Sequence, residues 1–90
     1  MEDRDEKGNT VKTVRLEYFA ILREQAGIAS ESVETNACNP AELFDELQHR
    51  HGFTLLPESL RVAINGDFCE PNCALCDGDE VVFIPPVAGG

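Results

Sequence analysis

Apolar and polar residues alternate along three stretches of the chain, which is the pattern of half-buried β-strands. The stretches are residues 11–19, 30–36 and 80–84, and the middle one alternates only weakly, around Val33. Successive side chains of a strand point to opposite faces, so the alternation also predicts which residues share a face. One face would hold Val14, Leu16, Tyr18, Val81 and Phe83, and the other would hold Phe19, Val82 and Ile84.

A β-hairpin is predicted in the second half of the chain. Residues 60–64 are predicted as a strand, and Asn65-Gly66 follows, a pair in which both residues tolerate positive φ. Residues 67–69 would begin the return strand. Asp77-Gly78-Asp79 predicts a further turn before the strand at 80–84.

Two helices are predicted, one short and one long. Residues 20–25 form the short one, which would end near Gly27. The longer helix has a clear start, because Asn39 can cap it and Pro40 stands where no amide donor is needed. Its apolar stripe consists of Leu43, Phe44 and Leu47, and Gly52 is its expected terminator.

These elements predict an α+β roll: a mixed sheet covered on one face by one main helix. A chain of 90 residues holds a single domain, which we place at residues 11–84, between a disordered acidic arm at 1–10 and a flexible C-terminal tail at 85–90. The core face would carry Leu16, Tyr18, Val62, Ile64, Val81 and Phe83. The open face would carry Phe19, Ala63, Phe68, Val82 and Ile84, and exposed apolar clusters mark interfaces.

The formal net charge of −10 changes the expected partners. It repels phosphate backbones and anionic lipids, which argues against nucleic-acid and membrane binding and favours a basic protein partner. Without an apolar leader, and with cysteines expected as thiols, the chain is predicted to be cytoplasmic. Acidic residues are expected to crowd the end from which the tail leaves: Asp67, Glu70, Asp77, Asp79 and Glu80.

The C-terminal tail is the candidate site of chemistry. Val87-Ala88-Gly89-Gly90 has no acid, base or nucleophile among its side chains, so its functional group is the α-carboxylate of Gly90. Pro85-Pro86 favours an extended backbone that leads the chain away from the sheet. The segment from Pro85 to Gly90 can span roughly 20 Å, and two terminal glycines keep it thin enough for a narrow tunnel.

Four segments carry a resemblance to a known family: residues 14–20 (VRLEYFA), 22–24 (LRE), 62–66 (VAING) and 78–90 (GDEVVFIPPVAGG). Together they resemble the small, sulfur-carrying subunit of molybdopterin synthase, the MoaD-type family. The closing block is the most specific part. The thiazole-pathway sulfur carrier is a more distant relative that shares the Gly-Gly end but not the Pro-Pro step.

The resemblance implies a ubiquitin-like β-grasp fold and a non-catalytic subunit of a heterotetrameric synthase. A separate E1-like enzyme would use ATP to adenylate Gly90, and a sulfurtransferase would supply sulfur for its thiocarboxylate. The sulfur would pass to a pterin precursor on the large subunit, which would carry the catalytic side chains, and no cofactor would be bound permanently. The residues expected to meet partners, with Gly89 beside the reacting carboxyl, are Phe19, Ala63, Phe68, Val82, Ile84, Pro85, Pro86, Val87 and Ala88.

Other functions are also consistent with the sequence. Gly90 could join the chain to lysines as a protein modifier, or serve the thiazole pathway. Cys69, Cys73 and Cys76 have a spacing found in iron–sulfur proteins and could seed a zinc site, but a fourth ligand would have to be distant, so we predict no metal. His49 and His51 point to different sides of a helix and do not form a metal pair.

Overall fold

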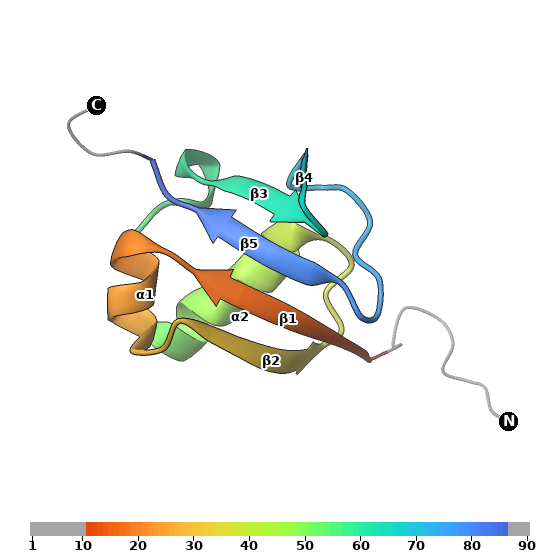
Figure 1. Ribbon diagram of the computed structural model, residues 1–90, viewed down its shortest axis with the longest axis horizontal. Helices are drawn as coiled ribbons and strands as arrows, with labels where there is room; N and C mark the ends of the chain where they lie inside the picture. The colour runs from red at the N-terminus through yellow and green to blue at the C-terminus, as the bar shows by residue number, and fades with distance from the viewer. Residues whose placement is uncertain (1–10, 87–90) are drawn as a thin grey trace, which may run out of the picture.

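The computed structural model describes residues 11–86 and contains a five-stranded mixed sheet with the order β2-β1-β5-β3-β4 (Figure 1). The central strands β1 and β5 are parallel, and the remaining neighbours are antiparallel. The predicted mixed sheet is therefore confirmed. Its strands are β1 (Lys12–Tyr18), β2 (Ser30–Thr35), β3 (Arg61–Ile64), β4 (Asp67–Cys69) and β5 (Glu80–Ile84).

The main helix, α2 (Pro40–His51), begins and ends where its sequence signals predict. The Asn39 side chain accepts a hydrogen bond from the Glu42 amide at 2.9 Å, and the Glu42 carboxylate accepts one from the Cys38 amide at 2.8 Å. These reciprocal bonds satisfy donors that a helix start leaves free. Gly52 ends the helix with a left-handed φ of 75°.

Two shorter helical segments complete the structure. The first, α1 (Ala20–Ala26), follows β1 as predicted, but its first residue, Ala20, has a φ of 55°. That left-handed conformation is uncommon for a residue with a side chain, and the sequence does not predict it. The second, a 3-10 turn called η1 (Pro57–Ser59), was not predicted either.

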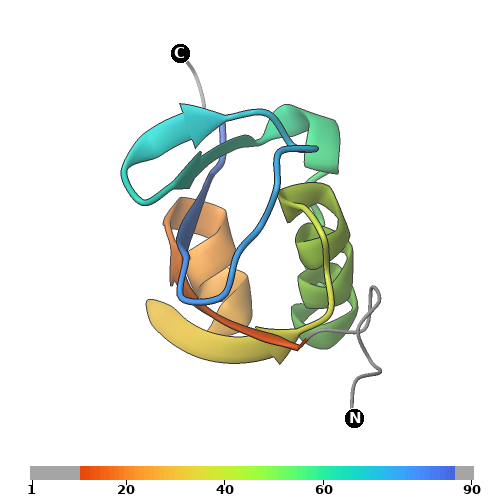
Figure 2. The same ribbon diagram turned by 90° about the vertical axis from the view of Figure 1, so that its right-hand side faces the viewer.

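The helix α2 packs across one face of the sheet, and no helix of residues 11–86 covers the other (Figure 2). The expected core residues on this face are buried, except that Ile64 is half-buried against the core. Three further core residues come from connecting or short segments, where no periodicity marks them: Leu22, Phe53 and Leu75.

The hairpin turn has the predicted chemistry, since Asn65 and Gly66 both adopt positive φ, 54° and 91°. The predictions for the arm at residues 1–10 and for residues 87–90 of the tail fall outside the described residues. Within residues 11–86, the helices are all too short and too polar to cross a bilayer.

Candidate functional site

The sheet face that α2 leaves uncovered, here called the open face, carries a row of residues that run across four strands. Strand register places Glu17 of β1 opposite Val82 of β5, Val82 opposite Ala63 of β3, and Ala63 opposite Phe68 of β4. Residues in register lie side by side on one face of a sheet. The predicted set of open-face residues is thus brought together by the tertiary structure.

A second row lies next to the first, at the end of β5. Arg61 of β3 is opposite Ile84, and Phe19 follows Tyr18, whose partner in β5 is Phe83. Continuation of this register places Phe19 beside Ile84. Two aromatic residues of the open face are exposed: Phe19, which follows β1, by 46%, and Phe68, in the edge strand β4, by 62%.

Not every predicted contact residue is accessible. Val82 and Ile84 are half-buried, and Ala63 is only 8% exposed because larger neighbours in β4 and β5 flank its methyl group. Ala63 therefore offers little contact area, and its role in partner binding stays a prediction. The accessible apolar surface consists mainly of the two phenylalanines, with Val82 and Ile84 between them.

Charged side chains border this apolar surface. The Arg61 guanidinium lies over the Phe68 ring, 4.6 Å from its centroid, which is a cation–π arrangement. At the start of β5, Arg15 Nε lies 3.8 Å from the Glu80 carboxylate, and both side chains are largely exposed. An apolar centre with a charged rim is typical of protein–protein interfaces.

The C-terminal segment leaves the body of the protein next to this surface. Strand β5 ends at Ile84, after which Pro85 is buried and Pro86 is exposed. Pro85 therefore offers little surface to a partner, whereas Pro86 is accessible, and the partner contacts expected for both stay predictions. The remaining predicted tail residues lie outside the described residues: Val87, Ala88, Gly89 and Gly90.

The predicted acidic cluster at the tail exit is wrong for four of its five residues. Asp67 pairs with Ile64, whose partner Val81 is near the start of β5, and only Glu70 lies close to Arg61, the partner of Ile84. Glu80 begins β5 and lies beside Arg15, whereas the tail follows Ile84 at the opposite end of the strand. Asp77 and Asp79 have structural roles there: their carboxylates accept hydrogen bonds from the Thr13 and Cys76 amides at 2.7 and 2.8 Å. These residues are close to the tail in sequence, but the first and last residues of a five-residue strand are about 13 Å apart.

A polar cluster that the sequence analysis missed closes the core between β2 and α2. Glu31 Oε2 accepts a hydrogen bond from the Tyr18 hydroxyl at 2.5 Å and lies 2.6 Å from His51 Nε2. Burial raises the pKa of Tyr18, and the neighbouring Glu31 carboxylate raises it further. No motif signals this cluster, because its members are far apart in the sequence.

The candidate metal ligands do not converge. Within residues 11–86, no three His, Cys, Asp or Glu side chains are grouped as a metal site. His49 Nδ1 bonds to the Asp45 carbonyl oxygen, whereas His51 bonds to Glu31, so the two rings serve different neighbours. Of the three closely spaced cysteines, only Cys69 and Cys73 are in contact, with 2.8 Å between their sulfurs.

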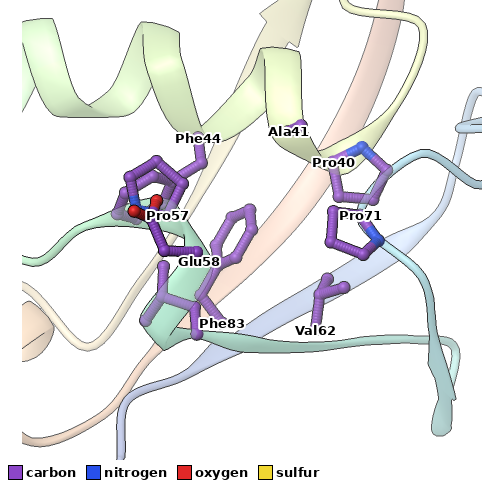
Figure 3. Close-up of a pocket in the computed structure, with 9 residues that line it drawn as sticks. Pro40, Ala41, Phe44, Pro57, Glu58, Val62, Pro71 and Phe83 are labelled. Atoms are coloured by element: carbon purple, nitrogen blue, oxygen red, sulfur yellow. The ribbon is translucent and has the colours of Figure 1, made fainter.

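An apolar cavity of about 250 Å³ lies on the α2 side of the sheet, away from the open face (Figure 3). Proline and phenylalanine side chains dominate its lining: Pro40, Phe44, Pro57, Pro71 and Phe83. Glu58 is the one titratable residue of that lining. The cavity therefore offers hydrophobic contact but no pair of groups for acid–base or nucleophilic catalysis.

Comparison with known proteins adds an independent line of observation. The profile of the ThiS family matches residues 16–90. The chain is 38% identical over 81 residues to the molybdopterin synthase sulfur carrier subunit of Mycobacterium tuberculosis, with 86% of this chain and 96% of that protein covered.

Two solved structures are similar to the protein. Small archaeal modifier protein 1 of Haloferax volcanii superposes with a TM-score of 0.72 and 26% identity, covering 84% of this chain and 99% of that one. A chain from the complex of subunits 1 and 2 of the Helicobacter pylori molybdopterin-converting factor gives a TM-score of 0.58 and 28% identity, covering 87% and 99%. The fold is the ubiquitin-like β-grasp expected from the sequence.

Proposed function

The chain belongs to the ThiS family, and on that basis we propose that it is the sulfur carrier subunit of a molybdopterin synthase. Its relatives at 29–38% identity bear that name. The α-carboxylate of Gly90 is the proposed reacting group, and Gly89 keeps the adjoining chain thin. The subunit itself contributes no catalytic side chain.

The proposed chemistry has two activation steps. A carboxylate is a poor electrophile, so an E1-like enzyme first joins Gly90 to AMP, consuming ATP and releasing pyrophosphate. A sulfur nucleophile provided by a sulfurtransferase then displaces AMP and leaves a thiocarboxylate. The thiocarboxylate sulfur attacks a pterin precursor held by the large subunit, where exclusion of water protects the reactive intermediates.

One observation carries this proposal: β5 ends at the border of the open face, so the C-terminal segment begins there. Ile84 ends the strand between Phe19 and Arg61, Pro85 is buried behind it, and the last residues of the chain follow Pro86. A partner that covers the open face is therefore positioned to receive the carboxyl terminus. In the H. pylori complex, a relative is bound to its second subunit.

We propose that the large subunit docks on the open face. Phe19 and Phe68 provide the exposed aromatic area that dominates many interfaces, and Arg61 is held over Phe68. Pro86 would be the first tail residue in contact, because Pro85 is buried. The cytoplasmic location expected from the sequence stays a prediction.

The test is mass spectrometry of the C-terminal peptide from protein isolated from its native cells. Cleavage after Glu80 releases residues 81–90, a peptide without cysteine, so any extra sulfur must be on the terminal carboxyl group. We expect one oxygen of Gly90 to be replaced by sulfur. An unmodified carboxylate in freshly isolated protein, in cells shown to contain the activating enzyme, would contradict the carrier function.

A second candidate function is protein modification, because a modifier protein of H. volcanii superposes with a TM-score of 0.72, above the 0.58 of the H. pylori chain. The peptide of residues 81–90 distinguishes a protein modifier from a sulfur carrier. In a modifier, residues 81–90 would be found joined through Gly90 to lysines of other proteins. A thiazole-pathway carrier would also carry the thiocarboxylate, and loss of the pterin product in a deletion strain separates it from the synthase subunit.

A further inference from the structure

Two of the four cysteines are brought into contact by a tight turn that follows β4. Cys69 is the last residue of the strand, and the Cys73 amide donates to the Glu70 carbonyl oxygen at 3.0 Å, closing a turn with Pro71 at its second position. The Cys73 thiol donates a hydrogen bond to Cys69 Sγ, with the sulfurs 2.8 Å apart. The proposed carrier chemistry uses neither thiol.

The surrounding structure holds this pair in place. Cys69 is half-buried against the hydrophobic core. The Pro71 carbonyl oxygen accepts a hydrogen bond from the Ala41 amide at the start of α2, at 2.9 Å. The loop is fixed again two residues beyond Cys73, where buried Leu75 donates to the Cys38 carbonyl oxygen at 3.0 Å. The two sulfurs therefore meet without a large rearrangement.

We propose that Cys69 and Cys73 form a redox modification site, which closes reversibly to a disulfide by exchange with a small-molecule disulfide. Cys38 and Cys76 are both exposed and show no sulfur contact within residues 11–86. The contact, rather than the spacing of the three cysteines, selects the pair. The inference is independent of the proposed carrier function.

The exchange balances in two steps. The Cys73 thiolate attacks one sulfur of the small disulfide, which releases one small thiolate and leaves a mixed disulfide on Cys73. Cys69 then loses its proton to solvent and attacks the Cys73 sulfur, which releases the second small thiolate. The two protein thiols lose two electrons and two protons, and one small disulfide is reduced to two thiols.

The environment of Cys69 sets the order of these steps. Burial, the hydrogen bond and charge interaction with Cys73, and the negative charges of Glu70 and Asp79 together raise its pKa to about 11. Because the thiolate is the nucleophile, Cys69 is the resolving thiol, and its deprotonation limits closure. The rate of closure should therefore rise as the pH is raised.

Labelling with two reagents tests the pair. The fully reduced chain is incubated with mixtures of reduced and oxidised glutathione, free thiols are blocked with N-ethylmaleimide, and disulfides are then reduced and labelled with iodoacetamide. Cleavage after Glu58 and Glu80 yields residues 59–80, which hold Cys69, Cys73 and Cys76. We expect the second label on Cys69 and Cys73 together and the first label on Cys76. The intact mass of a sample taken before the reduction step should show no attached glutathione.

Matched variants complete the experiment. In Cys73→Ser, Cys69 should stay a free thiol and react with N-ethylmaleimide. In Cys76→Ser, Cys69 and Cys73 should still form the disulfide and take the second label. Circular dichroism of both variants checks that the fold is retained. The proposal is overturned if the second label pairs Cys69 with Cys76 or Cys38, if glutathione stays attached, or if all four thiols take the first label across the redox series.

Discussion

His51 Nε2 lies 2.6 Å from Glu31 Oε2, so the last residue of α2 is tied directly to β2. The same oxygen accepts a hydrogen bond from the Tyr18 hydroxyl group. Because an ionised carboxylate can only accept hydrogen bonds, His51 Nε2 is a donor as well. Burial opposes ionisation of Glu31, but the hydrogen bonds from Tyr18 and His51, with the positive charge of Arg50 nearby, lower its pKa overall. The helix, the sheet and the core edge thus share one ionised carboxylate.

Removing this carboxylate should destabilise the fold. Glu31→Gln keeps the size of the side chain but replaces a charged acceptor of two hydrogen bonds, so we expect a loss of about 1.5–3 kcal/mol in the free energy of unfolding. Urea unfolding followed by circular dichroism measures it. Glu34→Gln, on an exposed position of the same strand, is the matched control and should change stability by less than about 0.5 kcal/mol. Equal effects of the two substitutions would show that the cluster contributes nothing.

The stability difference between the wild-type protein and Glu31→Gln should depend on pH. Because the folded protein lowers the pKa of Glu31 below its ordinary value of 4.5, the resulting stabilisation is fully present above that pH. It is lost as the pH falls through the folded pKa, where the carboxyl becomes protonated. The stability difference between wild type and Glu31→Gln should therefore be largest above about pH 4.5 and shrink as the pH is lowered below it. A difference that is constant with pH would contradict this role for the charge.

The left-handed Ala20 predicts a stabilising substitution. A residue with a side chain is strained at a φ of 55°, and glycine is not, so Ala20→Gly should be neutral or stabilising by up to about 1 kcal/mol. Ala41→Gly, in the first turn of α2, removes a side chain from ordinary helical backbone and should destabilise by about 0.5–1 kcal/mol. Thermal unfolding of both variants compares them, and a loss of stability at Ala20 as large as at Ala41 would refute the strain.

The proposed docking surface predicts the effect of a charge at its edge. Phe19→Asp places a carboxylate where an exposed aromatic ring stands, and it should weaken binding of the large subunit by at least about ten-fold. Leu56→Asp is the control, because Leu56 is also exposed but directly precedes η1, which lies beside α2. Titration calorimetry measures both. Unchanged affinity for Phe19→Asp, or equal losses for the two variants, would reject the open face as the docking site.

Local signals in the sequence were sufficient wherever a feature depends on neighbouring residues. Asn39 and Gly52 predicted both ends of α2, and Asn65-Gly66 predicted its turn, because caps and turns are closed by residues a few positions apart. Alternation also placed Phe19 and Phe68 on the open face. It could not show that Ala63 is covered, since that depends on the residues in the neighbouring strands.

The sequence by itself determined the type of each main element, the division into a core face and an open face, and the family, because periodicity, caps and the C-terminal motif are local. Only the tertiary structure decided which distant groups meet. It joined Glu31 to His51 across 20 positions and separated the acidic start of β5 from the tail at its end. It also selected Cys69 and Cys73 from four cysteines. These relationships depend on strand order, chain direction and one turn, which fix distances that residue spacing alone leaves open.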